Sequence, residues 1–182
     1  MAAPALRQIG WIAAAVLATG VLVAVATRGE PSGTGLSRFV PAGVMLRLPP
    51  ERATAVEVRG PERRWRFVRT ATGGWAAAVG SPPGAADLGE QVEAGLRFLH
   101  VSMPQRVLDR EEVRGADLAE MGLAPPRLIV TVFAGAEQPF AVALGGPNPQ
   151  GFAQYARVEG AEEVLLLNRY VGEAWAKAVA AP

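Results

Sequence analysis

Residues 54–79 read TAVEVRGPERRWRFVRTATGGWAAAV, and this stretch decides the fold of the chain. In its first run Val56 and Val58 alternate with charged residues, as expected of a strand with one buried face. In its second run Trp65 and Phe67 alternate with arginines in the same way. Turn-forming Gly-Pro-Glu and Thr-Gly-Gly sequences separate these runs from each other and from a third apolar run. The stretch therefore predicts an antiparallel meander of three strands.

A helix is predicted next, because Asp87 and Glu90 have the spacing of a capping box. Glu93 and Arg97 are four residues apart on its polar side, so we expect them to form an ion pair. The apolar residues of this helix form one stripe, which consists of Leu88, Val92, Leu96 and Leu99.

Two short elements should follow the helix. Residues 104–113, PQRVLDREEV, predict a returning strand. Residues 117–123, DLAEMGL, predict a short helix in which Asp117 and Glu120 repeat the cap spacing. Gly122 is placed to end that helix in the left-handed conformation.

Two hairpins and a final helix complete the expected domain. The hairpins pair RLIVTVF (127–133) with FAVALG (140–145), and AQYARVEG (153–160) with EEVLLLNR (162–169). The final helix starts at about Tyr170, with Tyr170, Ala174 and Ala178 toward the core and Glu173 paired to Lys177. The expected class is α+β: mainly antiparallel strands, as a meander and hairpins, with two or three packed helices.

The N-terminal part of the chain predicts one transmembrane helix. Residues 9–26, IGWIAAAVLATGVLVAVA, carry no charge and would span about 27 Å as a helix, close to the hydrocarbon thickness of a bilayer. The residues expected to anchor this helix in lipid are Trp11, Val16, Leu17, Val21, Leu22 and Val23. Ala24-Val25-Ala26 also fits a peptidase site, so a cleaved signal peptide is the competing interpretation.

The transmembrane interpretation divides the chain into four parts. These are a cytoplasmic N-terminus (1–8), the membrane helix (9–27), a linker or extended segment (28–52) and an α+β domain (53–182). Basic residues flank both ends of the apolar run, so the positive-inside rule alone does not fix its orientation. A short basic N-terminus usually stays in the cytoplasm, and we therefore expect a single-pass protein of the bacterial inner membrane with its C-terminal domain in the periplasm.

The apolar segment FVPAGVMLRLPP, residues 39–50, is broken by three prolines and cannot form a long helix. We expect it to be extended on the surface of the domain or of the membrane, and a contact with a partner is the alternative.

Composition excludes several functions. Basic residues number 18 and acidic residues 17, so the chain lacks the positive field that nucleic-acid binding requires. The absence of cysteine removes disulfides, thiolate catalysis and iron–sulfur clusters. His100 is the only histidine and is expected to be structural, because a lone histidine makes a poor metal site. We expect no catalytic residue, cofactor or metal, and therefore no enzyme.

The order of these elements resembles a family of unknown function, DUF4340, over roughly residues 50–180. The residues that carry the resemblance are Gly74-Trp75, Pro83, Asp87, Asp117-Leu118, Gly122-Leu123, Pro126, Leu144-Gly145, Tyr155, Arg157 and Val164. The resemblance implies an N-terminal membrane helix and, for some members, an association with ABC-type transport or gliding motility. It implies no catalytic residues.

Two surface regions are candidate partner contacts. Arg64 and Arg66 belong to a local arginine cluster that is either a solvated strand face or a contact with a protein or a lipid headgroup. Phe152 and Tyr155 flank the glycine-rich loop 145–151, and such loops often carry binding residues.

The function expected from the sequence is that of a non-catalytic, membrane-anchored accessory or assembly subunit of a larger inner-membrane complex, transport, respiratory or photosynthetic. Its partners would be the lipid bilayer and the protein subunits of that complex, with no nucleic acid. The alternative is a periplasmic ligand-binding component associated with an ABC-type transporter, which would require a concave pocket.

Overall fold

A computed structural model describes residues 43–78 and 87–180. The predicted membrane span and its anchor residues Trp11, Val16, Leu17, Val21, Leu22 and Val23 lie outside these ranges. Within the ranges, no helix combines the length and the apolar character that crossing a bilayer requires.

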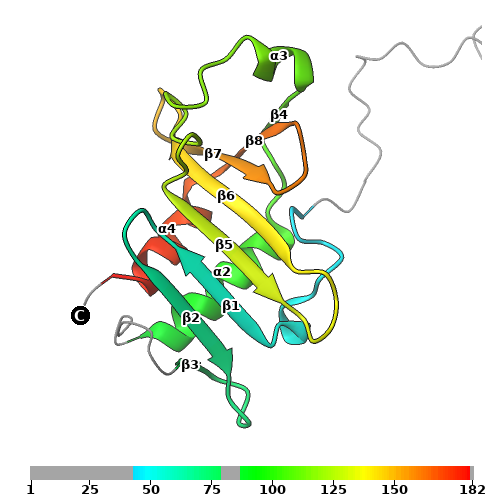
Figure 1. The fold of residues 1–182 in the computed structure, drawn as a ribbon, viewed down its shortest axis with the longest axis vertical. Coiled ribbons are helices and arrows are strands. Elements are labelled where there is room, and N and C mark those ends of the chain that lie inside the picture. The colour runs from blue at the N-terminus through cyan, green and yellow to red at the C-terminus, as the bar shows by residue number, and fades with distance from the viewer. Residues whose placement is uncertain (1–42, 79–86, 181–182) are drawn as a thin grey trace, which may run out of the picture. The chain divides into compact units, whose positions relative to one another are not determined.

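The described residues form an eight-stranded antiparallel sheet, ordered β3-β2-β1-β5-β6-β7-β8-β4, with its two long helices on one face (Figure 1). The strands are β1 (Ala55–Arg59), β2 (Arg64–Arg69), β3 (Trp75–Ala77), β4 (Arg106–Leu108), β5 (Leu128–Phe133), β6 (Phe140–Pro147), β7 (Ala153–Val158) and β8 (Val164–Asn168). The helices are the 3-10 turn η1 (Pro50–Arg52), α2 (Leu88–Val101), α3 (Arg110–Arg114) and α4 (Arg169–Ala178). The predicted α+β class, the meander β1-β2-β3 and both hairpins are confirmed.

The chain crosses the sheet twice. Helix α2 leads from β3 at one edge to β4 at the opposite edge, where β4 pairs with β8. The chain then returns to the centre, and β5 pairs with β1 along its whole length, from Ala55 opposite Phe133 to Arg59 opposite Ile129. This pairing joins the N-terminal meander to the C-terminal hairpins in a single sheet.

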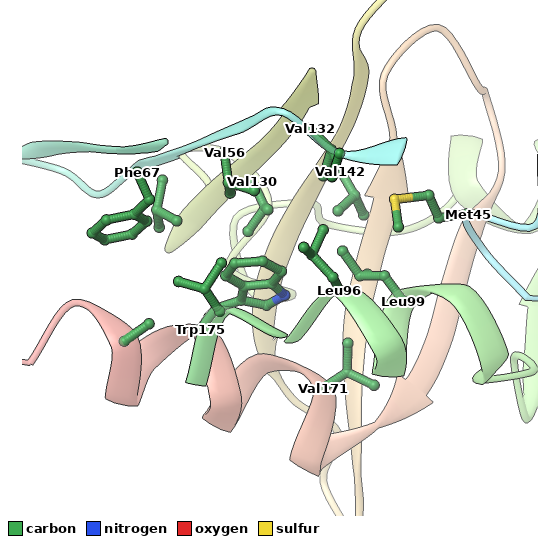
Figure 2. Close-up of a cluster of buried hydrophobic side chains, with 14 of the residues drawn as sticks. Met45, Val56, Phe67, Leu96, Leu99, Val130, Val132, Val142, Val171 and Trp175 are labelled. Carbon is green, nitrogen blue, oxygen red and sulfur yellow. The ribbon is translucent and has the colours of Figure 1, made fainter. Parts of the chain in front are cut away.

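The main core lies between the sheet and the helix pair α2 and α4. Trp175 of α4 is fully buried at its centre, below Val56 and Val130 of the central strands (Figure 2). The apolar stripe predicted for α2 is confirmed, since Val92 and Leu96 are also fully buried.

The opposite face of the sheet, here called the outer face, is covered on one side only. Residues of the connection 109–126 pack over β6, β7 and β8 in a second apolar cluster around Leu123 and Val164. No helix among the described residues lies over β2, β1 and β5 on this face (Figure 1). The helix side of the sheet is therefore covered by α2 and α4. On the outer face, the part formed by β2, β1 and β5, here called the open half, is not covered by a helix of the described residues.

The prediction for residues 104–113 is half wrong. Only Arg106–Leu108 form a strand, because Asp109 caps α3 by accepting hydrogen bonds from the backbone N–H groups of Glu111 (2.9 Å) and Glu112 (3.0 Å). The helix predicted at 117–123 is also replaced by consecutive turns. Gly122 does adopt the left-handed conformation, with φ +66°.

Two side-chain predictions on helix α2 are wrong. Asp87 precedes α2 but makes no capping bond, and its carboxylate accepts a hydrogen bond from Gln91 instead (2.6 Å). Glu93 does not pair with Arg97, because its carboxylate accepts hydrogen bonds from Arg69 and Trp75.

Helix α4 differs from its prediction in the same way. Tyr170 is 42% exposed, while Ala174 and Ala178 point to the core as predicted. Glu173 pairs with Arg169 (2.7 Å) instead of Lys177. The prediction was therefore right for Ala174 and Ala178, and wrong for the orientation of Tyr170 and for the ionic partner of Glu173.

Residues 39–50 were predicted to lie extended on a surface, and for the described part of this segment that prediction is wrong. Residues 43–48 form turns, and Met45 and Leu48 are buried in the main core. The backbone N–H of Met45 donates to the carbonyl oxygen of Leu99 (3.0 Å), which fixes this segment beside the end of α2.

Candidate partner-binding surface

A row of directly paired residues runs across the outer face of the sheet. Because paired residues in an antiparallel sheet project on the same side, the side chains of one row share a face. Strand register places one residue each from β2, β1, β5, β6 and β7 in this row, in the order Arg64, Arg59, Ile129, Ala143 and Arg157. The row has arginines at both ends and small or aliphatic side chains between them.

Arg59 and Arg64 are a like-charge pair directly opposite each other. Such pairs destabilise a sheet. Glu57 relieves part of this repulsion, since its carboxylate lies 3.4 Å from Arg64 and 3.9 Å from Arg66. The side chain of Arg59 has no hydrogen-bond or ion-pair partner among the described residues. The face therefore carries an uncompensated positive charge on a rigid central strand.

An aromatic ring lies on the same open half. The guanidinium of Arg66 stacks over the ring of Phe133, with its Cζ 4.8 Å from the ring centroid. At exposed sites such a cation–π contact stabilises by about 0.5–1 kcal/mol. Arg66 and Phe133 together give the open half a flat surface that is both cationic and apolar.

A hollow of about 400 Å³ lies beside this surface, where the open half meets the covered half. Its apolar lining includes Ile129, Ala143 and Leu123. Its charged lining consists of two arginines, Arg59 and Arg157, and two glutamates, Glu159 and Glu162. The Nε of Arg157 donates to the carbonyl oxygen of Ala161 (2.9 Å). The hollow can receive an apolar side chain, and Arg59, whose side chain has no partner among the described residues, can bind a carboxylate beside it.

The structure separates the residues that the sequence predicted as contacts. Arg64 and Arg66 are exposed on the open half, as expected. Phe152 is 57% exposed, in the connection before β7. Tyr155 is only half exposed, because it packs in the second apolar cluster beneath the connection 109–126. Strands β1, β5 and β6 lie between β2 and β7, so the four residues do not form one site.

Sequence reasoning missed two residues of this surface as contacts, Phe133 and Arg157. It included Arg59 in the local arginine cluster but did not place it beside a hollow. Alternation along β1 does place Arg59 on the same face as Glu57. No signal in the sequence pairs β1 with β5, however, and only that pairing brings Arg59 next to Ile129 and the hollow.

Two polar side chains near the end of α2, those of His100 and Ser102, have partners within the domain. The Nδ1 of His100 lies 3.2 Å from the carbonyl oxygen of Met45, and the hydroxyl of Ser102 lies 3.2 Å from that of Tyr170. Among residues 43–78 and 87–180, no three His, Cys, Asp or Glu side chains are grouped as metal ligands would be. The arrangement on the outer face is suited to binding.

Comparison with known protein families, curated proteins and solved structures finds no match to this chain.

Proposed function

We propose that this protein is a non-catalytic accessory or assembly subunit of a larger bacterial inner-membrane complex. Residues 9–26 would anchor it, and the α+β domain would bind a partner subunit outside the cytoplasm through the open half of its outer face. The uncharged N-terminal run and the resemblance to DUF4340, with its membrane-anchored members, support the anchored placement.

The observation that carries the proposal is the pair Arg59 and Arg64. Their direct opposition costs stability in the free domain, and Arg59 has no compensating partner in the described part of the chain. An acidic partner segment would neutralise both groups. Residues that lower stability in this way are typical of surfaces selected for binding.

Membrane tethering makes a modest interface sufficient. A domain confined near the bilayer meets a membrane partner at high effective concentration, so the affinity of the isolated surfaces need not be great. Charge complementarity would then contribute more to the selection of the correct partner than to the strength of binding.

Native electrophoresis of gently solubilised membranes tests this function. The full chain should migrate with a large complex, and the complex should dissociate as salt is raised, because exposed ion pairs are screened. Migration as a free monomer at every salt concentration would contradict the subunit proposal.

A ligand-binding component is the second candidate, and a second hollow favours it. This hollow of about 460 Å³ lies beside α4, with Leu128, Leu144 and Val179 among its apolar lining. Arg127 and Gln154 supply polar groups at its edge. A free monomer whose thermal midpoint rises with an added solute would favour this candidate over the first.

A further inference from the structure

Four large apolar side chains are exposed together at the end of the domain where α2 finishes. They are Leu46 (40% exposed), Val101 (59%), Met103 (60%) and Tyr170 (42%). We call them the apolar end patch. Only two other large hydrophobic side chains are exposed in the described ranges, Val107 and Phe152. The concentration at one end is what distinguishes this patch from ordinary surface hydrophobicity.

Hydrogen bonds hold the three segments of the patch together. The carbonyl oxygen of Met45, which precedes Leu46, accepts a hydrogen bond from the ring Nδ1 of His100 at 3.2 Å. The Tyr170 hydroxyl lies 3.2 Å from that of Ser102, which precedes Met103. The Tyr170 ring also contacts Phe98 edge to face, with 4.8 Å between centroids.

The patch lies where the N-terminal part of the chain enters the domain. Gly43, the first described residue, lies directly against the backbone of His100, with no space for a side chain. Residues 27–42 connect this point to the apolar run 9–26. A connection of that length spans at most about 55 Å, so it permits the patch to reach the surface of a membrane that the run spans.

The charges around the patch suit an anionic surface. Arg97 precedes Val101 by four residues and therefore shares its side of α2. Arg47 follows Leu46 directly. Both arginines are exposed, and neither has a hydrogen-bond or ion-pair partner among the described residues. Tyrosine and arginine next to aliphatic side chains are the residue types that favour a membrane–water interface.

We propose that the apolar end patch inserts into the surface of the lipid bilayer that residues 9–26 span. The domain then has two membrane attachments, the span and the patch, and this inference rests on the anchor in the proposed function. The patch lies beside the end of α2 and the start of α4, not on the outer face of the sheet. Insertion therefore leaves the arginine row free for a partner.

Single-cysteine labelling of the full chain tests the inference, because the native chain contains no cysteine. Met103→Cys and Leu46→Cys place an environment-sensitive NBD fluorophore in the patch. Glu62→Cys is the matched control, since Glu62 is exposed in the turn between β1 and β2 and is not part of the apolar end patch. The proteins are reconstituted at low density in vesicles of phosphatidylethanolamine and phosphatidylglycerol, with or without a lipid that carries a nitroxide at the headgroup.

Each outcome has one meaning. We expect the patch probes to emit at shorter wavelength than the control and to be quenched by the nitroxide lipid. Quenching equal to that at Glu62 would overturn the inference while leaving the anchor intact. A blue shift without lipid quenching would also overturn it, because the patch would then contact protein. Failure of the chain to float with the vesicles would instead overturn the anchor, and with it the proposed function.

Discussion

Gly95 of α2 lies directly beneath the indole ring of Trp175 in α4. A Cβ atom at position 95 would be 2.6 Å from Cε2 of that ring, closer than packed carbon atoms approach. The missing side chain is therefore what allows the two helices to meet. Trp175 fills the centre of the main core (Figure 2). It can do so because position 95 has no side chain.

Gly95→Ala should destabilise the domain by about 1–3 kcal/mol, since overpacking outweighs the better helix propensity of alanine. Chemical denaturation of the full chain in mild detergent, followed by circular dichroism, measures the change. Gly89→Ala is the control in the same helix, because a Cβ there would be 4.0 Å from its nearest neighbours. The control should be neutral or stabilising by up to about 1 kcal/mol. Equal effects of the two substitutions would refute the close helix contact.

Arg69 links the sheet to the start of the domain. Its guanidinium stacks on Trp75, 4.5 Å from the ring centroid, and lies 3.3 Å from the Glu93 carboxylate. It also donates hydrogen bonds to three backbone carbonyl oxygens, those of Pro50, Ala53 and Gly73.

Arg69→Met should therefore lower the free energy of unfolding by at least about 2 kcal/mol, because it leaves several acceptors unpaired. Arg69→Lys should restore little, since an ammonium group cannot reproduce the planar donor geometry. Arg63→Met, at an exposed turn residue, should stay within about 0.5 kcal/mol of the wild type. The same denaturation assay compares the three variants. If Arg69→Met is as stable as Arg63→Met, Arg69 does not link the sheet to the start of the domain.

Asp109 caps α3, whereas Asp87 makes no cap bond at α2. Asp109→Ala should cost about 1 kcal/mol of local stability, and Asp87→Ala less than about 0.5 kcal/mol. Amide hydrogen exchange followed by mass spectrometry should show faster exchange over residues 109–115 only for Asp109→Ala. A larger loss of stability in Asp87→Ala than in Asp109→Ala would contradict the structure and favour the cap that the sequence predicts at Asp87.

The sequence predicted most elements because their patterns are local. Alternation of Trp65 and Phe67 with arginines, and the stripe that contains Val92 and Leu96, each reflect the periodicity of a single element. The ion pair predicted for Glu93 failed because it depends on packing between elements. The i,i+4 spacing predicted Arg97 as its partner, but packing of α2 on the meander places Arg69 and the Trp75 indole within hydrogen-bond distance of its carboxylate.

The candidate surface was only partly predictable for a related reason. Arg64 and Arg66 could be placed on one face from their own strand. Arg59 and Ile129 become neighbours only through the pairing of β1 with β5, which are separated in the chain by two crossings of the sheet. Contacts of such long range carry no signature in one sequence. Tyr155 was predicted to be a partner contact, but it packs against residues of the connection 109–126, and its sequence neighbours do not indicate this long-range contact.

The central claim is that the arginine row binds an acidic partner, and Arg59→Glu tests it most directly. The substitution replaces a like-charge pair with an ion pair to Arg64, so the free domain should gain about 0.2–1 kcal/mol of stability. Lys177→Glu, an exposed charge reversal on the helix side of the domain, is the control. Migration of each variant on native electrophoresis of solubilised membranes is the measurement. The account predicts that Lys177→Glu migrates with the complex and that Arg59→Glu, although folded, runs as free protein; an Arg59→Glu variant that still migrates with the complex would contradict it.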